Sequence, residues 1–390
     1  MKLLCALCIL ACSGCLTLQV FGHASDASDQ NDSTAPRKML EKKLISSAME
    51  ILDIFDYHNQ PFSEPADRRV KGFVLGYVTP WNNKGYDRAV KYAQKFTHIS
   101  PVWLQVHPGE ARGEDYVVKG THDIDNGWVT RIRESNPKIK IVPRFLLEGF
   151  DGKSFQALIY DNDKAQSFAV AVAKILKENK LDGAVLEMWK PVSDDGDRKA
   201  MRQAIKTIAS KLKKDGFQTV LVVPPSGGQN VAGRLRSEDF AFLADSIVAF
   251  SVMTYDHPET YSSGGPIAPL KWVSDSLESI VPAAKEKNKR KKLLLGLNHY
   301  GYDWSRPKGA EAILSSTYLE QLKKHQPVLQ WDEKSGEHSY KYYNEKGIDH
   351  LVHFPTLKSV DLRIILANKL GVGIAIWDLG QGLDYFFDLL

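Results

Sequence analysis

The chain of 390 residues is 43% hydrophobic and 25% charged, which is the composition of an ordinary globular protein and is enough for one large domain. Its 51 Lys and Arg residues against 47 Asp and Glu residues leave a formal charge of +4. That surplus is too small to indicate nucleic acid or an anionic membrane as a partner, so charge does not select a function.

The first residues have the pattern of a secretory signal peptide. Lys2 precedes an apolar run over residues 3–20, and small residues follow at 22–24, so we expect residues 1–24 to be removed. A membrane anchor is the alternative, although the run is barely long enough to span a bilayer. All four cysteines lie in this segment, so the mature chain would fold in an oxidising compartment without disulfides. We expect a secreted or lysosomal protein with no membrane span after signal removal.

Residues 25–65 are expected to form a polar leader and an N-terminal helix. The leader lacks hydrophobic periodicity, which is typical of disorder. It contains the sequon that begins at Asn31, for which glycosylation and a chance match both stay open. Apolar residues spaced three and four apart between Met39 and Tyr57 predict a helix on the outside of the main domain.

Residues 66–390 are expected to form an α/β domain, a (β/α)8 TIM barrel. Short runs that are apolar on both faces alternate with amphipathic stretches such as 163–180 and 198–217, and this order favours a closed parallel barrel. A doubly wound sheet is the weaker alternative, because no glycine-rich phosphate turn follows the first run. The eight predicted strands lie in residues 70–78, 96–106, 138–146, 181–189, 218–225, 246–256, 292–300 and 371–379.

A small inserted subdomain, at about residues 305–360, is expected between strand 7 and strand 8. Two runs of alternating polarity within 327–344 flank a turn at 333–336, which predicts a β-hairpin. An insertion at this point lies on the carboxyl-terminal face of a barrel, where active sites are built, so it would wall one side of a cleft. A decorative surface loop is the alternative.

Several motifs together resemble glycoside hydrolase family 18, the chitinases and chitinase-like proteins. They are "LDGAVLEMW" at 181–189, "MTYD" at 253–256, the tryptophan of the last strand at 377 and the insertion before it. The stretches "GYVTPWN" at 76–82 and "GQGLDYFFDLL" at 380–390 extend the resemblance over most of the chain. The resemblance implies a D-G-x-D-x-D-x-E motif on the fourth strand, with the final Glu as general acid and the substrate's N-acetyl group as nucleophile.

The chain departs from that motif at the positions that carry the catalytic carboxyl groups. Asp182 matches the first position, but Val185, Glu187 and Trp189 occupy the later ones, and we expect all four to face the barrel interior. An indole N–H cannot protonate a leaving group, and loss of a general acid typically costs on the order of 10²- to 10⁴-fold in rate. The four positions are therefore interpreted as vestigial, with no catalytic residue among them. Glu187 lies roughly 6.5 Å deeper along the strand than the acid position, which makes it a poor substitute.

An inward carboxylate at Glu187 needs a partner. The sequence leaves two candidates open: Arg144, and a shared network with Tyr255 and Asp256 in which two close carboxylates would raise one another's pKa.

Aromatic side chains near the carboxyl ends of the predicted strands indicate a saccharide site, because sugar rings stack on aromatic faces while polar groups bind their hydroxyls. By the resemblance, Trp377 forms its floor. No histidine spacing indicates a metal, and no motif indicates a cofactor. The candidate saccharide-binding residues are Tyr77, Trp81, Trp103, Glu187, Trp189, Tyr255, Asp256, Tyr300 and Trp377.

Three functions remain open. The favoured one is a saccharide-binding protein, or lectin, without efficient hydrolase activity, whose ligand is an oligosaccharide such as N-acetylglucosamine oligomers or bacterial cell-wall glycans. The second is a weak glycosidase that uses Glu187. The third is a protein-interaction scaffold with a vestigial cleft, for which binding to a scavenger-type sorting receptor within the family offers an analogy.

Overall fold

The computed structural model describes residues 41, 43–60, 66–109, 113–192, 194–226, 233–282 and 287–390. The predicted signal peptide, the polar leader and the sequon at Asn31 lie outside the described residues. Within the described part of the chain, no helix is long and apolar enough to cross a membrane.

The prediction of a closed parallel barrel is confirmed. Neighbouring strands pair in parallel around the ring, and the last barrel strand pairs with the first, with Val74 opposite Ile374. The barrel strands are β1 (Val74–Val78), β2 (His98–Pro101) with β3 (Leu104–Pro108), β5 (Lys140–Ile141) with β6 (Arg144–Leu147), β7 (Gly183–Glu187), β8 (Gln218–Val223), β9 (Ala249–Val252), β10 (Leu293–Asn298) and β16 (Gly373–Trp377).

Two barrel strands are interrupted, which the sequence did not indicate. The second strand breaks at Val102 and Trp103, and its halves β2 and β3 pair with β5 and β6 respectively. The third strand breaks at Val142 and Pro143, where proline has no N–H to donate to a neighbour. Beyond the barrel, β3 extends into an antiparallel hairpin with β4 (Tyr116–Lys119).

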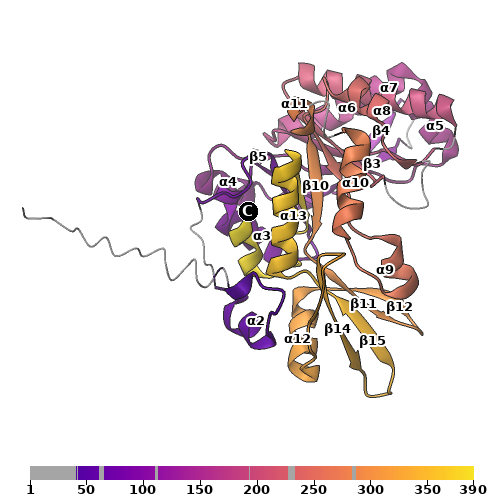
Figure 1. The fold of residues 1–390 in the computed structure, drawn as a ribbon. Helices are drawn as coiled ribbons and strands as arrows, with labels where there is room; N and C mark the ends of the chain where they lie inside the picture. The colour runs from indigo at the N-terminus through magenta and orange to yellow at the C-terminus, as the bar shows by residue number, and fades with distance from the viewer. Residues whose placement is uncertain are drawn as a thin grey trace, which may run out of the picture.

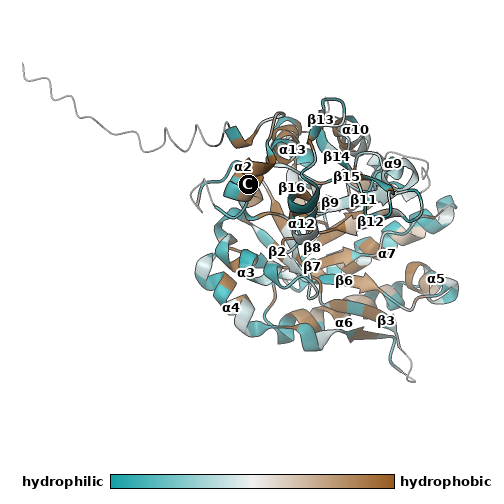
Figure 2. Cartoon of the chain, turned by 90° about the horizontal axis from the view of Figure 1, so that it is seen from below, coloured by the Kyte–Doolittle hydropathy of each residue, from teal (hydrophilic) through white to brown (hydrophobic). Residues whose placement is uncertain are grey.

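Helices surround the barrel, as Figures 1 and 2 show. Figure 2 colours barrel strands such as β6 and β7 largely brown, and the surrounding helices carry both teal and brown residues, as amphipathic helices do. The helices are α3 (Lys84–Lys91), α4 (Asn126–Ser135), α5 (Gly152–Tyr160), α6 (Asn162–Glu178), α7 (Asp195–Lys214), α8 (Ser237–Leu243), α9 (Pro258–Ser263), α10 (Leu270–Ile280), α11 (Lys287–Arg290) and α13 (Leu357–Leu370), with a final 3₁₀ helix, η4 (Asp384–Leu389).

Two apolar cores follow from this arrangement. The larger one lies between the barrel wall and the helices. The smaller one fills the barrel and includes Leu75, Tyr77, Val185, Val220 and Leu294 from different strands. A filled interior leaves binding to the open carboxyl-terminal end of the barrel, where the loops that follow the strands meet.

The predicted insertion before the last barrel strand is also confirmed, and it is larger than a hairpin. It forms a five-stranded antiparallel sheet in the order β12-β11-β15-β14-β13, with one helix, α12 (Ser315–His325). The predicted hairpin is the β13–β14 pair within it, with Trp331 opposite His338. In Figure 1 the orange strands of this sheet project from one end of the barrel. The strands are β11 (Gly301–Ser305), β12 (Gly309–Ile313), β13 (Gln330–Asp332), β14 (Glu337–Tyr343) and β15 (Asp349–His353).

The prediction of one helix from Met39 to Tyr57 is wrong in extent. The continuous helix α2 covers only Ile51–Tyr57. A turn precedes it, in which the hydroxyl oxygen of Ser46 accepts a hydrogen bond from the N–H of Ala48. Serine side chains favour such local bonds over helix, and periodicity alone does not reveal them.

Candidate saccharide site at the barrel mouth

Strand geometry brings three predicted site residues to one end of the barrel. Tyr77 lies near the end of β1, Glu187 ends β7 and Trp377 ends β16. Tyr77 and Trp377 both belong to the cluster inside the barrel, and their ring centroids are 5.2 Å apart. Val185 lies in the same interior cluster, two residues before Glu187, as the period of a strand requires.

Arg144 is the partner of Glu187. It begins β6, and its Nη1 atom lies 3.2 Å from Oε2 of Glu187. The same guanidinium lies over the Trp377 ring, 5.5 Å from its centroid. The Nε atom of Arg144 is buried and has no hydrogen-bond partner among the described residues. Because a buried N–H usually has a partner, this orphaned donor is consistent with a ligand at the site.

Asp256 lies on the side of the mouth that faces the insertion. It follows β9 with a φ of 62°, and its Oδ1 atom accepts hydrogen bonds from the hydroxyls of Tyr300 at 2.5 Å and Tyr302 at 3.1 Å. Burial raises the pKa of Asp256, although hydrogen bonds from Tyr300, Tyr302 and Tyr261 oppose the rise. Among the described residues no hydrogen bond joins Asp256 to Glu187, whose ion-pair partner is Arg144. Of the two partners that the sequence left open for Glu187, the structure shows Arg144.

Tyr255 links the two halves of the mouth. Its ring centroid lies 6.2 Å from that of Tyr300, which belongs to a small apolar cluster that Trp377 also contacts. Burial raises the pKa of Tyr255 well above its usual value, and the nearby charges of Asp256 and Glu187 add to the rise. Both phenol and carboxylate groups of the mouth therefore lie close enough to affect one another.

Trp189 does not point into the barrel, which corrects the prediction. Its indole N–H donates to the carbonyl of Gly233 at 2.9 Å, and the guanidinium of Arg198 from α7 lies 5.5 Å from its ring. It therefore belongs to the outer core between the barrel and the helices. The reason is that β7 ends at Glu187, so the alternation of a strand no longer fixes the direction of later side chains.

Two further predicted residues lie elsewhere. Trp103 is fully buried behind the barrel wall, where its indole donates to the hydroxyl of Tyr86 at 2.8 Å. Asp182 precedes β7 at the opposite end of the strand from Glu187, and it forms ion pairs with Arg133 at 2.8 Å and Lys140 at 3.1 Å. Neither residue can contact a ligand at the mouth.

Trp81 is 66% exposed in the loop after β1, so its ring is available to a ligand. The sequence did not indicate two further tyrosines of the mouth, Tyr302 and Tyr261. The Tyr302 hydroxyl donates to Asp256 and lies 2.8 Å from the hydroxyl of Tyr261. These tyrosines come from α9 and from the insertion, so only the tertiary structure brings them to the mouth. Among the described residues, no group of three or more His, Cys, Asp or Glu side chains has the arrangement of a metal site.

The structure is therefore a filled (β/α)8 barrel whose carboxyl-terminal end carries aromatic rings beside an ion-paired carboxylate, which makes this end the candidate saccharide site. Sequence comparison identifies the family: the chain belongs to the glycosyl hydrolases of family 18, whose profile matches residues 74–382.

Relatives and solved structures agree with this assignment. The "Uncharacterized glycosylase YvbX" of Bacillus subtilis is 23% identical over 328 residues, which are 82% of this chain and 91% of that protein. A "Cortical fragment-lytic enzyme" of Bacillus cereus is 27% identical over 194 residues, but only 47% of this chain and 43% of that enzyme are covered.

Among structures, the chitinase of Chromobacterium violaceum has a TM-score of 0.66 at 20% identity and covers 82% of this chain and 97% of its own. A family 18 chitinase of Cycas revoluta, solved in complex with (GlcNAc)3, has a TM-score of 0.66 at 17% identity, covering 81% and 97%. These structural likenesses show a shared fold.

Proposed function

We propose that this chain is a saccharide-binding member of family 18 without efficient hydrolase activity. The observation that carries the proposal is the position of Trp189. It stands where the family motif has its general acid, and its indole is bonded to Gly233 behind the barrel wall. Neither its chemistry nor its direction allows it to protonate a glycosidic oxygen.

The remaining mouth residues support binding rather than bond cleavage. Glu187 is held by Arg144 as an ion-pair acceptor, whereas a general acid must donate a proton to the leaving group. Trp377 is only partly buried and Trp81 is exposed, so both offer ring surface to a sugar, and the guanidinium of Arg144 lies over the Trp377 ring. N-acetylglucosamine oligomers and bacterial cell-wall glycans have sugar rings that can stack on aromatic side chains, and polar groups that can accept hydrogen bonds.

A weak glycosidase is the second candidate, and one observation favours it. Asp256 is a mouth carboxyl whose pKa is raised, as a general acid requires. Its Oδ1 atom is nevertheless occupied by the tyrosine hydroxyls of Tyr300 and Tyr302. A third proposal is a protein-interaction scaffold with a vestigial cleft, bound by a scavenger-type receptor. This proposal rests on family analogy.

Hydrolysis of fluorogenic chitobiose and chitotriose separates these candidates. We expect no turnover above buffer for the mature protein, and no change in Glu187→Gln or Asp256→Asn. Turnover that Glu187→Gln or Asp256→Asn abolishes, in a variant with an unchanged melting curve, would make the chain an enzyme and overturn the proposal.

We also propose, from the pattern of residues 1–24, that the chain is secreted or lysosomal. Within the family we propose a kinship with chitinase domain-containing protein 1, which "GYVTPWN", "SVMTYD" and "GQGLDYFFDLL" resemble. Detection of the mature N-terminus in the medium of expressing cells tests the first proposal, and its retention in the cytosol would contradict it.

A further inference from the structure

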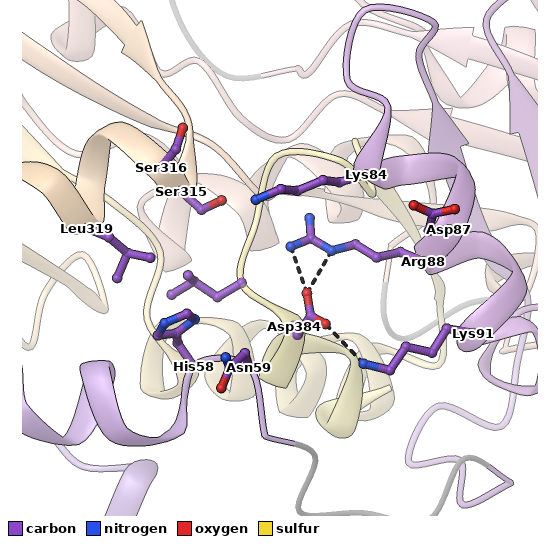
Figure 3. Close-up of a pocket in the computed structure, with 11 residues that line it drawn as sticks. His58, Asn59, Lys84, Asp87, Arg88, Lys91, Ser315, Ser316, Leu319 and Asp384 are labelled. Carbon is purple, nitrogen blue, oxygen red and sulfur yellow. Dashed lines mark hydrogen bonds and ion pairs between the residues drawn. The ribbon is translucent and has the colours of Figure 1, made fainter.

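A pocket of about 360 Å³ lies outside the barrel (Figure 3). Residues from α3, the start of α12, the end of α2 and the turn into η4 line it, and none of them belongs to the barrel mouth. Its volume is in the range of sites for small organic ligands. Leu319 and Leu383 provide apolar wall.

Positive charge exceeds negative charge in this pocket. Asp384 is already engaged by two cations, since its Oδ1 lies 2.7 Å from Arg88 and its Oδ2 lies 3.1 Å from Lys91. Lys84 forms no ion pair with any residue that the structure describes, and its ammonium group extends into the pocket (Figure 3). Asp87 is exposed, and in Figure 3 its carboxylate lies beyond Arg88, away from the centre.

Uncommitted hydrogen-bond donors face Lys84 from the other wall. Ser315 is only 6% exposed, its hydroxyl has no hydrogen-bond partner within the described chain, and its oxygen points toward the lysine (Figure 3). Ser315 begins α12, an 11-residue helix whose N-cap, Leu314, has no side-chain acceptor. The N–H of Ser315 itself donates to the carbonyl of Gln381 at 2.9 Å, so the amides of Ser316 and Thr317 are the first-turn donors without a partner among the described residues. The amino-terminal end of a helix attracts anions through its free N–H groups and its dipole.

His58 also lines the pocket. The pKa of His58 is lowered chiefly by burial; Asp384 opposes this, while Lys84 and Arg88 lower it further. At neutral pH the ring is therefore an uncharged donor and acceptor beside two cations. A ligand that enters this pocket meets positive charge, a hydroxyl, amide groups and an apolar wall.

We propose that this pocket binds a phosphate or sulfate ester carried on a small soluble molecule. Lys84, the Ser315 hydroxyl and the first turn of α12 hold the oxyanion, and the carrying group lies against Leu319 and Leu383. A tetrahedral oxyanion accepts hydrogen bonds in several directions, so it can engage donors on both walls at once. This site is independent of the saccharide proposed at the barrel mouth.

Calorimetric titration of the full chain tests the proposal. Inorganic phosphate and sulfate are added at constant ionic strength against chloride, followed by glucose 6-phosphate, glucose 6-sulfate and glucose. We expect saturable binding of the oxyanions, tighter binding of at least one ester, and none of glucose. The phosphate and sulfate arms identify the preferred anion. Heats no different from chloride would overturn the site, and esters no tighter than free ions would overturn the role of the apolar wall.

Three variants test whether the anion binds in this pocket. Lys84→Gln removes the one pocket cation that forms no ion pair, so we expect affinity to fall about tenfold, the loss of a charge-assisted bond. Ser315→Ala removes a neutral donor and should weaken binding roughly threefold. Lys153→Gln is the matched control, since it changes another exposed lysine in the first turn of a helix, α5, and should leave affinity unchanged. Wild-type affinity in folded Lys84→Gln contradicts the proposal.

Discussion

Trp377 is the residue on which the proposed saccharide site depends most. It ends β16, lies against Tyr77 inside the barrel and has the guanidinium of Arg144 over its ring. Its ring is only partly buried, so one portion remains available to a ligand. A sugar that stacks on this portion would lie beside the guanidinium of Arg144, which is over the same ring.

Replacement of Trp377 by Ala is expected to weaken binding of N-acetylglucosamine oligomers at least tenfold. An indole contact of about 60–80 Å² at about 25 cal/mol per Å² contributes roughly 1.5–2 kcal/mol, and tenfold corresponds to about 1.4 kcal/mol. Calorimetric affinity is the measurement, with the melting curve recorded beside it because the ring also packs in the core. Unchanged affinity in a folded variant would move the ligand away from the mouth.

Asp256 gives a prediction about pH. Because burial raises its pKa in the folded state above the ordinary aspartate value of 3.8, the folded protein holds this proton more tightly than the unfolded chain. Its contribution to stability is therefore complete below about pH 3.8 and is lost as pH rises through the folded pKa. Asp256→Asn cannot ionise and escapes this loss.

The melting temperature of Asp256→Asn relative to wild type should thus increase between pH 3.5 and pH 7. Thermal unfolding of both proteins across this range is the measurement. A difference that stays constant, or that decreases with pH, would contradict the raised pKa.

At the scale of elements, one buried carboxylate joins the loops that follow β1 and β16. The Oδ2 atom of Asp378 accepts hydrogen bonds from the Thr79 hydroxyl at 2.8 Å and from the Asn82 amide at 2.9 Å, and its Oδ1 accepts from the Gly380 N–H at 2.7 Å. These loops carry Trp81 and adjoin Trp377. The carboxylate therefore fixes the spacing of two walls of the mouth.

Asp378→Ala is expected to lower the free energy of unfolding by about 1–3 kcal/mol, because buried donors lose their acceptor. Asp378→Asn retains an acceptor oxygen and should cost less. Denaturant unfolding measures both values. Equal stability of the Ala variant and wild type would show that these bonds do not hold the loops.

The sequence predicts elements well where their periodicity is imposed by packing on both sides. Barrel strands such as β8 and β10 contain runs without polar side chains, VLVV and LLLGL, so their existence and order were readable. Side-chain direction was readable only within a strand: Val185 and Glu187 lie as expected, whereas Trp189 comes after β7 has ended. Trp103 was misplaced because it lies at the break between β2 and β3. The contact of Asp256 with Tyr302 depends on how the insertion folds back, which no local pattern records.

At the scale of the whole molecule, a buried ion pair fastens the insertion to the barrel. Glu337 of β14 accepts from Arg363 of α13 at 2.9 Å and from the backbone N–H groups of Ile267 and Ala268 at 2.9 Å and 2.7 Å. Burial acts to raise the pKa of Glu337, but the imidazole of His353, 3.5 Å away, and the charge of Arg363 outweigh it and leave the pKa lowered. This stabilisation is present above pH 4.5, the ordinary pKa of a glutamate, and is lost as pH falls through the folded pKa.

Glu337→Ala is expected to reduce the free energy of unfolding by about 3–5 kcal/mol, because it leaves a buried guanidinium without its counter-ion. Glu311→Ala is the matched control in the same insertion. It breaks the exposed pair with Lys308, whose atoms are 3.0 Å apart, and should cost less than about 1 kcal/mol. Chemical denaturation compares the two variants, and similar costs would contradict a clamping role for Glu337.

The central claim, that the barrel mouth binds saccharide without cleaving it, is tested most directly by isothermal titration calorimetry. N-acetylglucosamine tetramer is injected into the mature wild-type protein, and the heat is followed long after each injection. We predict a saturable isotherm in which every injection returns to the original baseline. A baseline displaced by the continuing heat of hydrolysis, or an absence of binding heat at every temperature tested, would contradict the account.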